Sequence, residues 1–519
     1  MKRRVTAVLL AMLVLPAVAH AQIRFANLLQ AQAGNIPYTP PLNRTDLYDQ
    51  ARLDATFDAL TFGGRFEVRE NSERVLTYRE ITQRYAEWSG DHLHGRVGNF
   101  YTIVGRGLIH RSFELPGVII DQAGSRSEFG FSRDVDGVLL DGDAGPVAVR
   151  LFGGEPTEGT VSAAKDETSP RYAGQVVGGQ ATLDVWRGSR VGAGYVRTSV
   201  VDPFAGVDRQ DELGTGFVEI DPLALAGVSL FSLPLYGEYA QLDRSFGQWW
   251  DFDRGGGAPH ALYVSSNLLA GPVALSAEWK DYQRFRLGTN DPPSLVREHA
   301  FALLNRATHV LSADDEHGFQ LEGSYALPGW GSFTANHSRS DGIAGRSHRR
   351  FFESYFELRA APSRWSGEEA TLFFDRGQDT FNNLSDRAAW GGSFTVRALG
   401  SWSATVDAER SDATRFFAAV ARRRPESFTD QRLAVSVARA EWGSLGVIAE
   451  KSSDPSIRSD KRPTTDRAFF ATTATARLGE HHLATLTIGE RRGGRACTAG
   501  TCYDVPDFRG AELRVTSKY

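Results

Sequence analysis

Residues 510–519 read GAELRVTSKY, and their side chains alternate in character from one position to the next. One phase contains Ala511, Leu513, Val515, Ser517 and Tyr519, and the other contains Glu512, Arg514, Thr516 and Lys518. A period of two is typical of a β-strand with one apolar face and one wet face. The stretch therefore predicts a two-faced strand whose last residue is aromatic.

The same alternation recurs throughout the chain, in WSATVDAE (402–409), FFESYFELRA (351–360), PVALSAEWK (272–280) and FQLEGSYAL (319–327). Each segment is long enough for a strand, and each has polar residues along only one face. The predicted apolar face includes Phe356, Leu358, Val406, Leu513 and Val515, and the predicted wet face includes Glu357, Asp407 and Arg514. The sequence thus predicts many two-faced strands in series.

The connections between these strands are short and long in turn. Tight turns with glycine occur in WSGDH (88–92), LAGPV (269–273) and AEWGS (440–444), whereas long polar loops cover 450–467 and 489–507. Five of the ten tryptophans lie beside a predicted short turn: Trp88, Trp186, Trp330, Trp402 and Trp442. Short turns at one rim, long loops at the other and an aromatic belt are features of a transmembrane β-barrel.

A closed antiparallel barrel also explains the alternation, because strands in lipid must pair every backbone group and leave no open edge. We therefore predict an all-β transmembrane barrel of about 16–22 strands, with short periplasmic turns and long extracellular loops. The final strand resembles the closing strand of bacterial outer-membrane barrels, with Tyr519 at the position of their terminal aromatic residue. That resemblance implies recognition by the barrel-assembly machinery. The alternative is a large soluble β-protein, which would need longer apolar runs and a filled core.

The beginning of the chain has the features of a secretory signal peptide. A basic MKRR, an apolar VTAVLLAMLVLPAV and a small-residue AHA site before Gln22 predict that residues 1–21 are removed on export. We expect residues 22–58 to be a periplasmic or lumenal segment, and residues 59–519 to form the barrel in the outer membrane. Without the three basic residues of the leader, 55 basic residues face 63 acidic ones, a net charge of −8. This charge gives no reason to expect a nucleic-acid partner, and the expected surroundings are outer-membrane lipid.

One stretch, RVGNFYTIVGRGLIHRSFELPGVIIDQ (96–122), loses the alternation after it begins as a strand. Its GNFY…GRGL…R pattern resembles an uncharacterised family of bacterial outer-membrane proteins, a domain of unknown function. That likeness covers about 30 residues and implies no activity. Because charges of both signs stand beside apolar residues, we expect residues 105–145 to fold into the lumen and line a constriction. The constriction residues would be Arg106, His110, Arg111, Glu114 and Asp121, with His110 adding positive charge below about pH 6.5. An ordinary rim loop is the alternative.

Two further motifs concern bonds and ions. Cys497 and Cys502 are the only cysteines, and outside the cytoplasm they predict a disulfide that closes the tip of an extracellular hairpin. DVDGVLLDGDAG (134–145) concentrates four aspartates, but its spacing differs from that of an EF-hand calcium loop. A solvated loop is the favoured interpretation, and neither a metal nor a cofactor is expected.

The favoured function is a porin-like channel through which small polar solutes diffuse. The alternatives are a structural or adhesive barrel that presents long loops, and a membrane-embedded lipid hydrolase. NHSRSDG (336–342) is the one candidate for the hydrolase, and there His337 and a serine would have to share the lipid-facing side. Because Ser338 and Ser340 alternate with His337 and Arg339, they lie on opposite sides of the strand. We therefore expect no enzymatic activity.

Overall fold

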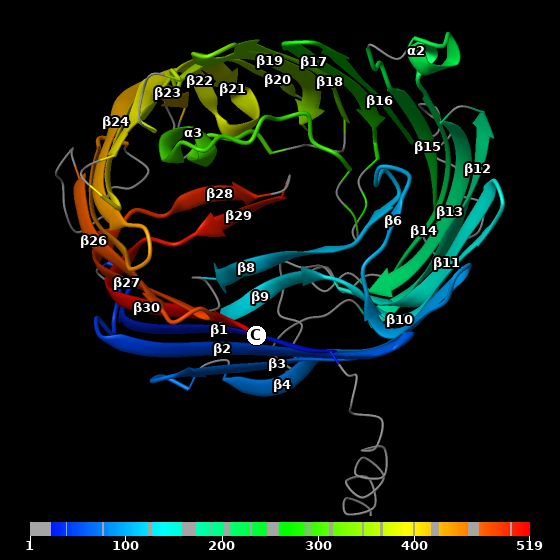
Figure 1. Ribbon diagram of the computed structural model, residues 1–519, viewed down its shortest axis with the longest axis horizontal. Coiled ribbons are helices and arrows are strands. Elements are labelled where there is room, and N and C mark those ends of the chain that lie inside the picture. The colour runs from blue at the N-terminus through cyan, green and yellow to red at the C-terminus, as the bar shows by residue number, and fades with distance from the viewer. Residues whose placement is uncertain are drawn as a thin grey trace, which may run out of the picture.

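A computed structural model of the chain shows a closed ring of antiparallel strands (Figure 1). The structure describes residues 22–519 except 38, 75–76, 123–126, 158–172, 187, 202–207, 229–230, 246–258, 286, 288–289, 291, 311–314, 345–346, 364–366, 398–399, 417–424, 455–466 and 499–500. The predicted signal peptide, residues 1–21, lies outside the described residues. No helix in the described part of the chain is long and apolar enough to cross a membrane.

The ring is a single sheet of 24 strands. Its strands are β1 (Gln22–Asn35), β2 (Arg44–Phe57), β3 (Leu60–Asn71), β4 (Tyr78–Ser89), β5 (Leu93–Phe100), β10 (Val135–Ala144), β11 (Val147–Pro156), β12 (Ala173–Trp186), β13 (Ser189–Val201), β14 (Asp208–Ile220), β15 (Leu235–Ser245), β16 (His260–Ala270), β17 (Val273–Gln283), β18 (Asp315–Leu327), β19 (Gly331–Ala344), β20 (Ser347–Ala360), β21 (Glu369–Asp379), β22 (Leu384–Arg397), β23 (Trp402–Phe416), β24 (Pro425–Arg439), β25 (Gly443–Ser452), β26 (Arg467–Leu478), β27 (His482–Arg491) and β30 (Phe508–Lys518).

Most strands pair with their neighbours in the sequence, and the last strand closes the ring by pairing with the first. The β1–β30 register runs from Ala26↔Lys518 to Asn35↔Arg509. Tyr519 extends this seam, because its N–H donates to the Phe25 carbonyl (2.8 Å) and its own carbonyl accepts from the Phe25 N–H (3.1 Å). Every strand of the ring therefore has two partners, which is what a barrel in lipid requires.

The alternation of exposed side chains agrees with the predicted facing. Phe356, Leu358, Val406 and Leu513 are 39–43% exposed on the outer face. The inward phase contains Arg514, whose guanidinium donates to the Gln30 side chain at 2.6 Å. Outward residues are thus apolar because they meet lipid, and inward ones find polar partners.

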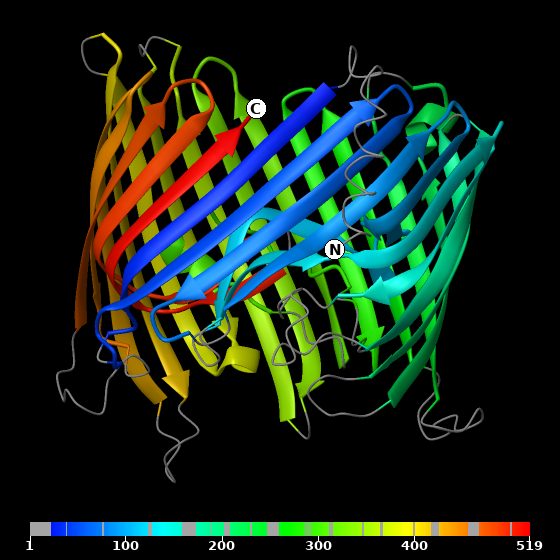
Figure 2. The same ribbon diagram turned by 90° about the horizontal axis from the view of Figure 1, so that it is seen from below.

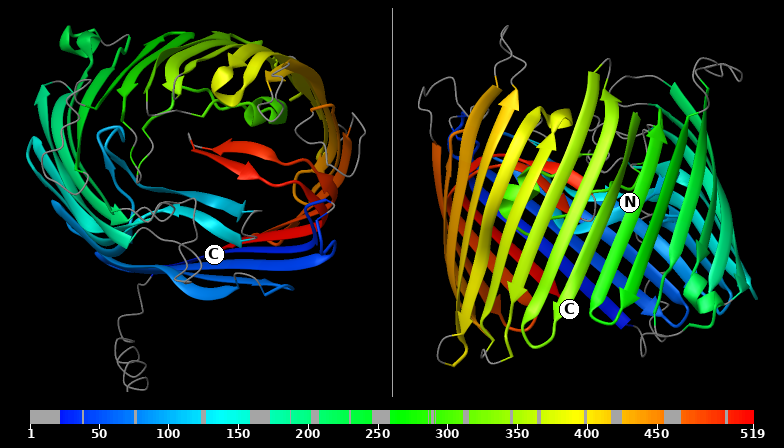
Figure 3. Two further views of the ribbon diagram at one scale, coloured as in Figure 1. Left: turned by 180° about the vertical axis from the view of Figure 1, so that it is seen from behind. Right: turned by 90° about the horizontal axis from the view of Figure 1, so that it is seen from above.

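Figures 2 and 3 show the two rims of the barrel from the side. The five tryptophans predicted to form a belt all lie near the ends of strands at the short-turn rim, and they are 42–65% exposed. Arg439 lies over the rings of both Trp402 (5.7 Å) and Trp442 (4.7 Å). The Arg439 guanidinium is thus the polar group at the interface, and the exposed tryptophan rings are directed towards lipid.

The fold class is as predicted, but the strand count of 24 exceeds the predicted range of 16–22. The expected periplasmic or lumenal segment 22–58 instead forms β1 and β2, so the barrel begins at Gln22 rather than at residue 59. The outward phase of these strands contains Asn27 and Asp49, which weakens the apolar pattern. Their side chains hydrogen-bond to each other at 2.6 Å, so the two polar groups satisfy one another on the outer face.

The described residues of three segments that connect wall strands fold inside the ring (Figures 1 and 3). The first insert (residues 101–134) contains β6 (Ile103–Val104), β7 (His110–Arg111), β8 (Phe113–Gln122) and β9 (Ser127–Arg133). The second insert (284–310) contains α3 (Ala302–Arg306), and the third (492–507) contains β28 (Gly494–Thr498) and β29 (Thr501–Val505). Two short elements belong to the rims: α2 (Pro222–Leu225) and the turn η2 (Thr380–Asn382).

The first insert differs in extent from the predicted lumenal segment 105–145. Residues 135–144 form the wall strand β10, with Val138 and Leu140 exposed on the outer face. The solvated loop predicted for residues 134–145 is therefore wrong, because Asp136, Asp141 and Asp143 lie along this strand. Asp141 accepts from Arg150 at 2.5 Å, so it already has a cationic partner.

An apolar core fills one side of the lumen. The inner faces of β10–β17 contribute apolar side chains, and the first and second inserts pack against them. The buried cluster comprises Phe100, Val104, Leu108, Ile109, Val135, Leu139, Phe152, Val176, Val196, Leu213, Tyr236, Ala240, Leu242, Ala261, Tyr263, Tyr282, Phe285, Leu287 and Leu295. This lumenal core departs from the uniformly polar interior that the alternation predicted, because each of these wall strands places at least one apolar side chain inward, beside polar ones such as Glu238 and Lys280.

Candidate functional site

The first insert is anchored by its GRGL turn, residues 105–108. Gly105 has φ +57°, and a Cβ there would lie 2.4 Å from the Glu238 carboxylate, so the turn needs a glycine at this position. The Arg106 N–H donates to the same carboxylate at 2.8 Å, and the Gly105 N–H donates to Gln180 at 3.0 Å. Asn290 of the second insert donates to the Gly107 and Leu108 carbonyls. The motif therefore ties one insert to the wall and to the other insert.

The predicted constriction residues divide into buried anchors and one exposed cation. Arg106 is exposed within the lumen, with its guanidinium 4.5 Å from the Tyr236 ring centre. Arg111 is half-buried over the Phe113 ring, at 4.3 Å. Glu114 accepts from Arg65 (3.1 Å) and Arg52 (3.3 Å) of the wall. Glu114 thus fastens the insert to β2 and β3.

His110 does not carry the charge that the sequence predicted. It is 2% exposed and stacks on the Phe152 ring at 4.8 Å. Burial, reinforced by the nearby positive charge of Arg133, lowers the pKa of His110 to about 3. The imidazole is therefore neutral at physiological pH and acts as part of the apolar packing.

Two further acidic residues of the first insert approach the wall: Asp121 of β8 and Glu128 of β9. Burial and the charges of Asp121 and Asp46 raise the pKa of Glu128 to about 8. Burial also raises the pKa of Asp121 to about 6, against the opposing effect of Arg44. Neither oxygen of the Glu128 side chain has a hydrogen-bond partner among the described residues. Glu128 is thus held largely protonated near neutral pH.

The second insert is fixed to the wall by buried ion pairs. His299 contacts Glu353 at 3.0 Å, and Arg387 bridges Glu353 (2.5 Å) and Asp375 (2.6 Å). His299, Glu353 and Asp375 form the one group in the described residues whose ligand atoms are close enough, within 4.8 Å, to hold a metal ion. Because the Arg387 guanidinium lies between the two carboxylates, the chain itself supplies the cation.

His309 anchors the other end of the second insert. It contacts Asp379 (3.0 Å) and Glu316 (3.2 Å) and stacks on the Phe351 ring at 4.4 Å. Burial opposes its charged form, but the hydrogen bonds and charges of Asp379 and Glu316 outweigh burial and raise the pKa of His309 to about 9. This histidine is therefore a cation within a buried network.

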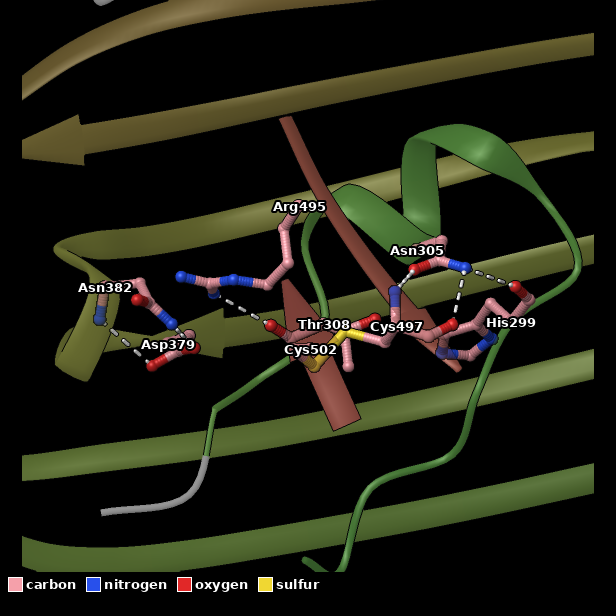
Figure 4. The surroundings of a disulfide bond; sticks show 8 residues. All are labelled: His299, Asn305, Thr308, Asp379, Asn382, Arg495, Cys497 and Cys502. Carbon is pink, nitrogen blue, oxygen red and sulfur yellow. Dashed lines mark hydrogen bonds between the residues drawn. A yellow bond between two sulfur atoms is a disulfide. The ribbon is translucent and has the colours of Figure 1, made fainter. Parts of the chain in front are cut away.

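The third insert is a hairpin joined by the Cys497–Cys502 disulfide, and Figure 4 shows its surroundings. The hairpin folds into the lumen and does not stand outside the barrel as predicted. Cys497 is 6% exposed, and its N–H donates to the Asn305 side chain of α3 at 2.9 Å. Arg495 donates to the Thr308 carbonyl at 3.1 Å. The inward fold follows from these bonds to the second insert.

Two of the polar cavities formed by the described residues lie inside the ring. The first, about 250 Å³, lies at the short-turn end and includes His94, Asp141, Arg150, Gln180 and Thr182 in its lining. The second, about 370 Å³, lies between the second insert, the third insert and the inner faces of β21–β24. We call them the short-rim cavity and the long-rim cavity. The latter was not predicted, because its lining comes from segments that are far apart in the sequence.

The hydrolase candidate also has a defined geometry. His337 faces outward and contacts the Ser354 hydroxyl of β20 at 2.8 Å, and neither Ser338 nor Ser340 shares its face. The backbone groups of β19 and β20 are engaged in their ladder, so they offer no donors to a developing oxyanion. His337 is midway along β19, whereas lipid ester groups lie at the membrane interface. The pair is thus explained by mutual satisfaction of two polar groups in lipid.

The fold, the lipid-facing exterior and the aromatic belt define an outer-membrane β-barrel. No family model matches the chain, and no curated protein matches it. The translocation pore of the P pilus usher PapC aligns with a TM-score of 0.46 and 10% identity, over 96% of this chain and 99% of that one. The siderophore receptor PirA from Pseudomonas aeruginosa aligns with a TM-score of 0.46 and 10% identity, over 96% of this chain and 80% of that one. OccK5 (OpdH) from the same organism aligns with a TM-score of 0.38 and 13% identity, over 70% of this chain and 94% of that one.

Proposed function

We propose that this protein is an outer-membrane channel that passes small polar solutes by diffusion, through a lumen narrowed by its three inserts. The observation that carries the proposal is the long-rim cavity of about 370 Å³, which is lined by charged side chains inside the ring. A barrel that served only as a scaffold would have no need to keep such a polar space. The surrounding wall is fixed by ion pairs, so the space has a defined shape.

Selectivity in this channel would come from charges that face the remaining space. Arg106 is the exposed cation of the five residues proposed to line a constriction, whereas Glu114 is engaged in ion pairs and His110 is neutral. Charges in a narrow, partly desolvated path act more strongly on an ion than charges at a wide rim. We therefore expect Arg106 to favour anions, with Arg111 and Asp121 contributing less.

Single-channel recording in planar bilayers tests the channel. Ser411 lines the long-rim cavity on the inner side of β23, and Ala408 lies on the outer side of the same strand. Ser411→Trp should reduce conductance severalfold because the indole fills the cavity, whereas Ala408→Trp should leave it unchanged. Equal conductance of the two variants would show that solutes do not pass this cavity, and no conductance at all would contradict the channel.

A non-transporting barrel is the second candidate, and the lumenal core favours it. An apolar core that fills one side of the lumen stabilises the barrel but excludes water from part of the cross-section. In that case the long loops would serve in adhesion or assembly. The expected result is a folded, heat-stable barrel without conductance.

Two further expectations belong to the same proposal. The final strand and Tyr519 would be recognised by the barrel-assembly machinery, because Tyr519 lies at the seam where the ring closes. The GNFY…GRGL…R stretch would mark an uncharacterised outer-membrane family in which it serves as a lumenal anchor. Neither expectation assigns a solute.

A further inference from the structure

The long-rim cavity is lined by charges of both signs. These arginines and aspartates belong to the wall, the second insert and the third insert, and almost all of them are held in ion pairs. The lining charges are Arg306, Arg387, Arg415, Arg492, Arg495, Asp379, Asp430, Asp454, Asp504 and Asp507. Arg306 pairs with Glu450, Arg415 with Asp454, Arg492 with Asp430 and Asp507 with Arg467. These pairs fix the shape of the cavity, and their charges are compensated within the protein.

Two charges of the third insert differ from the others. Arg495 and Asp504 lie directly opposite each other in the β28–β29 hairpin and line the cavity. Among the described residues, Asp504 makes no hydrogen bond or ion pair, and the only partner of the Arg495 guanidinium is the neutral Thr308 carbonyl. Both side chains therefore retain their capacity for a charged partner.

The disulfide holds these two charges in register. Cys497 and Cys502 are the pair two residues further along the same ladder, so they lie on the same face of the hairpin as Arg495 and Asp504. A covalent link at this point limits sliding and opening of the two short strands. The backbone positions of Arg495 and Asp504 are thus held opposite each other, which suits recognition of a ligand that carries two opposite charges close together.

We propose that the long-rim cavity binds small zwitterions of amino-acid to dipeptide size, with the ligand carboxylate on Arg495 and the ligand ammonium on Asp504. The proposal rests on the proposed channel and names the solute class that the cavity selects. A guanidinium matches a carboxylate through two parallel hydrogen bonds, and a carboxylate accepts from an ammonium. A volume of about 370 Å³ is at the small end of ligand pockets, which excludes large solutes.

Ligands with one charge fit this cavity less well. A simple anion would gain Arg495 but would lie beside the uncompensated carboxylate of Asp504. A simple cation would gain Asp504 but would meet the Arg495 guanidinium. Only a ligand that carries both charges satisfies both groups, and each unmade charged contact in a partly buried site is costly.

Isothermal titration calorimetry on the purified full-length barrel in detergent tests the site at pH 7. The probe is L-glutamine, whose side chain is neutral, with N-acetyl-L-glutamine lacking the ammonium and L-glutamine methyl ester lacking the carboxylate. We expect L-glutamine to bind at least tenfold more tightly than either derivative. Arg495→Gln and Asp504→Asn should each weaken L-glutamine binding at least tenfold, and Arg150→Gln, in the short-rim cavity, should not.

Reduction of the disulfide gives a second measurement on the unaltered chain. Binding of L-glutamine should weaken after reduction while the heat stability of the barrel is retained. Equal binding of all three probes, or equal effects of Arg495→Gln and Arg150→Gln, would overturn the zwitterion site. Conductance without L-glutamine binding would overturn this inference and leave the channel intact, whereas binding without conductance would support the site and contradict the channel.

Discussion

Substitution of Val406 with arginine tests whether the outer face of the wall lies in lipid. Val406 is 41% exposed and lies between Phe394 of β22 and Val435 of β24, which are 47% and 42% exposed on the same face. It is four residues from Trp402, which marks the short-turn interface. At about 3.3 Å per residue and a tilt of about 40°, Val406 lies about 10 Å below that interface.

The apolar band of such a barrel is about 25 Å tall, so Val406 is close to the midplane. An arginine there should lower the free energy of unfolding by about 2–4 kcal/mol, the range for lipid-facing cations at the midplane. Asp407 faces the lumen one residue further on, so Asp407→Arg should cost less than about 1 kcal/mol. The measurement is reversible urea unfolding in lipid vesicles. Equal losses for the two variants would refute the assignment of faces.

Further predictions concern the lumen. Arg387→Gln leaves Glu353 and Asp375 buried without their shared cation, and should lower the free energy of unfolding by about 3–5 kcal/mol in the same assay. The raised pKa of Glu128 means that attachment of the first insert is strongest below about pH 4.5 and weakens as the pH rises towards 8. Protease digestion of the insert should therefore increase over this interval, and Glu128→Gln should reduce the dependence and leave only the part due to Asp121, whose pKa is raised to about 6. The lowered pKa of His110 predicts that this residue contributes nothing to any change in ion selectivity between pH 7 and 5, so His110→Phe should behave as the parent protein does; a shift that is lost in His110→Phe would contradict its neutral state. A thiol reagent should label the protein only after reduction, and Cys502 before the more buried Cys497; labelling without reductant would exclude the disulfide.

The alternation of side chains was enough to predict the class of fold, because lipid on one side and water or protein on the other act on every strand. The facing of Val406 and Leu513 and the positions of the five tryptophans follow from that constraint alone. The pattern failed for β1 and β2, where Asn27 and Asp49 satisfy each other on the outer face and so remove the apolar signal. The strand count was too low for this reason.

The candidate site was less accessible to sequence reasoning because it is assembled from distant segments. Loss of alternation after Tyr101 correctly indicated a departure from the wall, but not that Leu108 and Ile109 would join an apolar core. The hairpin places Arg495 opposite Asp504 in the strand register, whereas the position of both residues in a cavity depends on α3 and on β21–β24. No local pattern records such contacts, although the cysteine spacing did indicate the hairpin that carries both residues.

The lumenal core has a consequence for biogenesis. Strands β10–β17 each carry apolar side chains on the inner face, beside polar ones, as well as on the outer face, whereas the strands of a water-filled barrel offer only one face with apolar side chains before they reach the membrane. During transit through the periplasm, this part of the chain therefore exposes more apolar surface than the other wall strands and is the more prone to aggregation. The segment from Phe100 to Leu295 is nearly continuous in sequence and contains both inserts that cover its inner face. It can thus bury one face early by local collapse, and deliver to the membrane strands that are already lined on the inside.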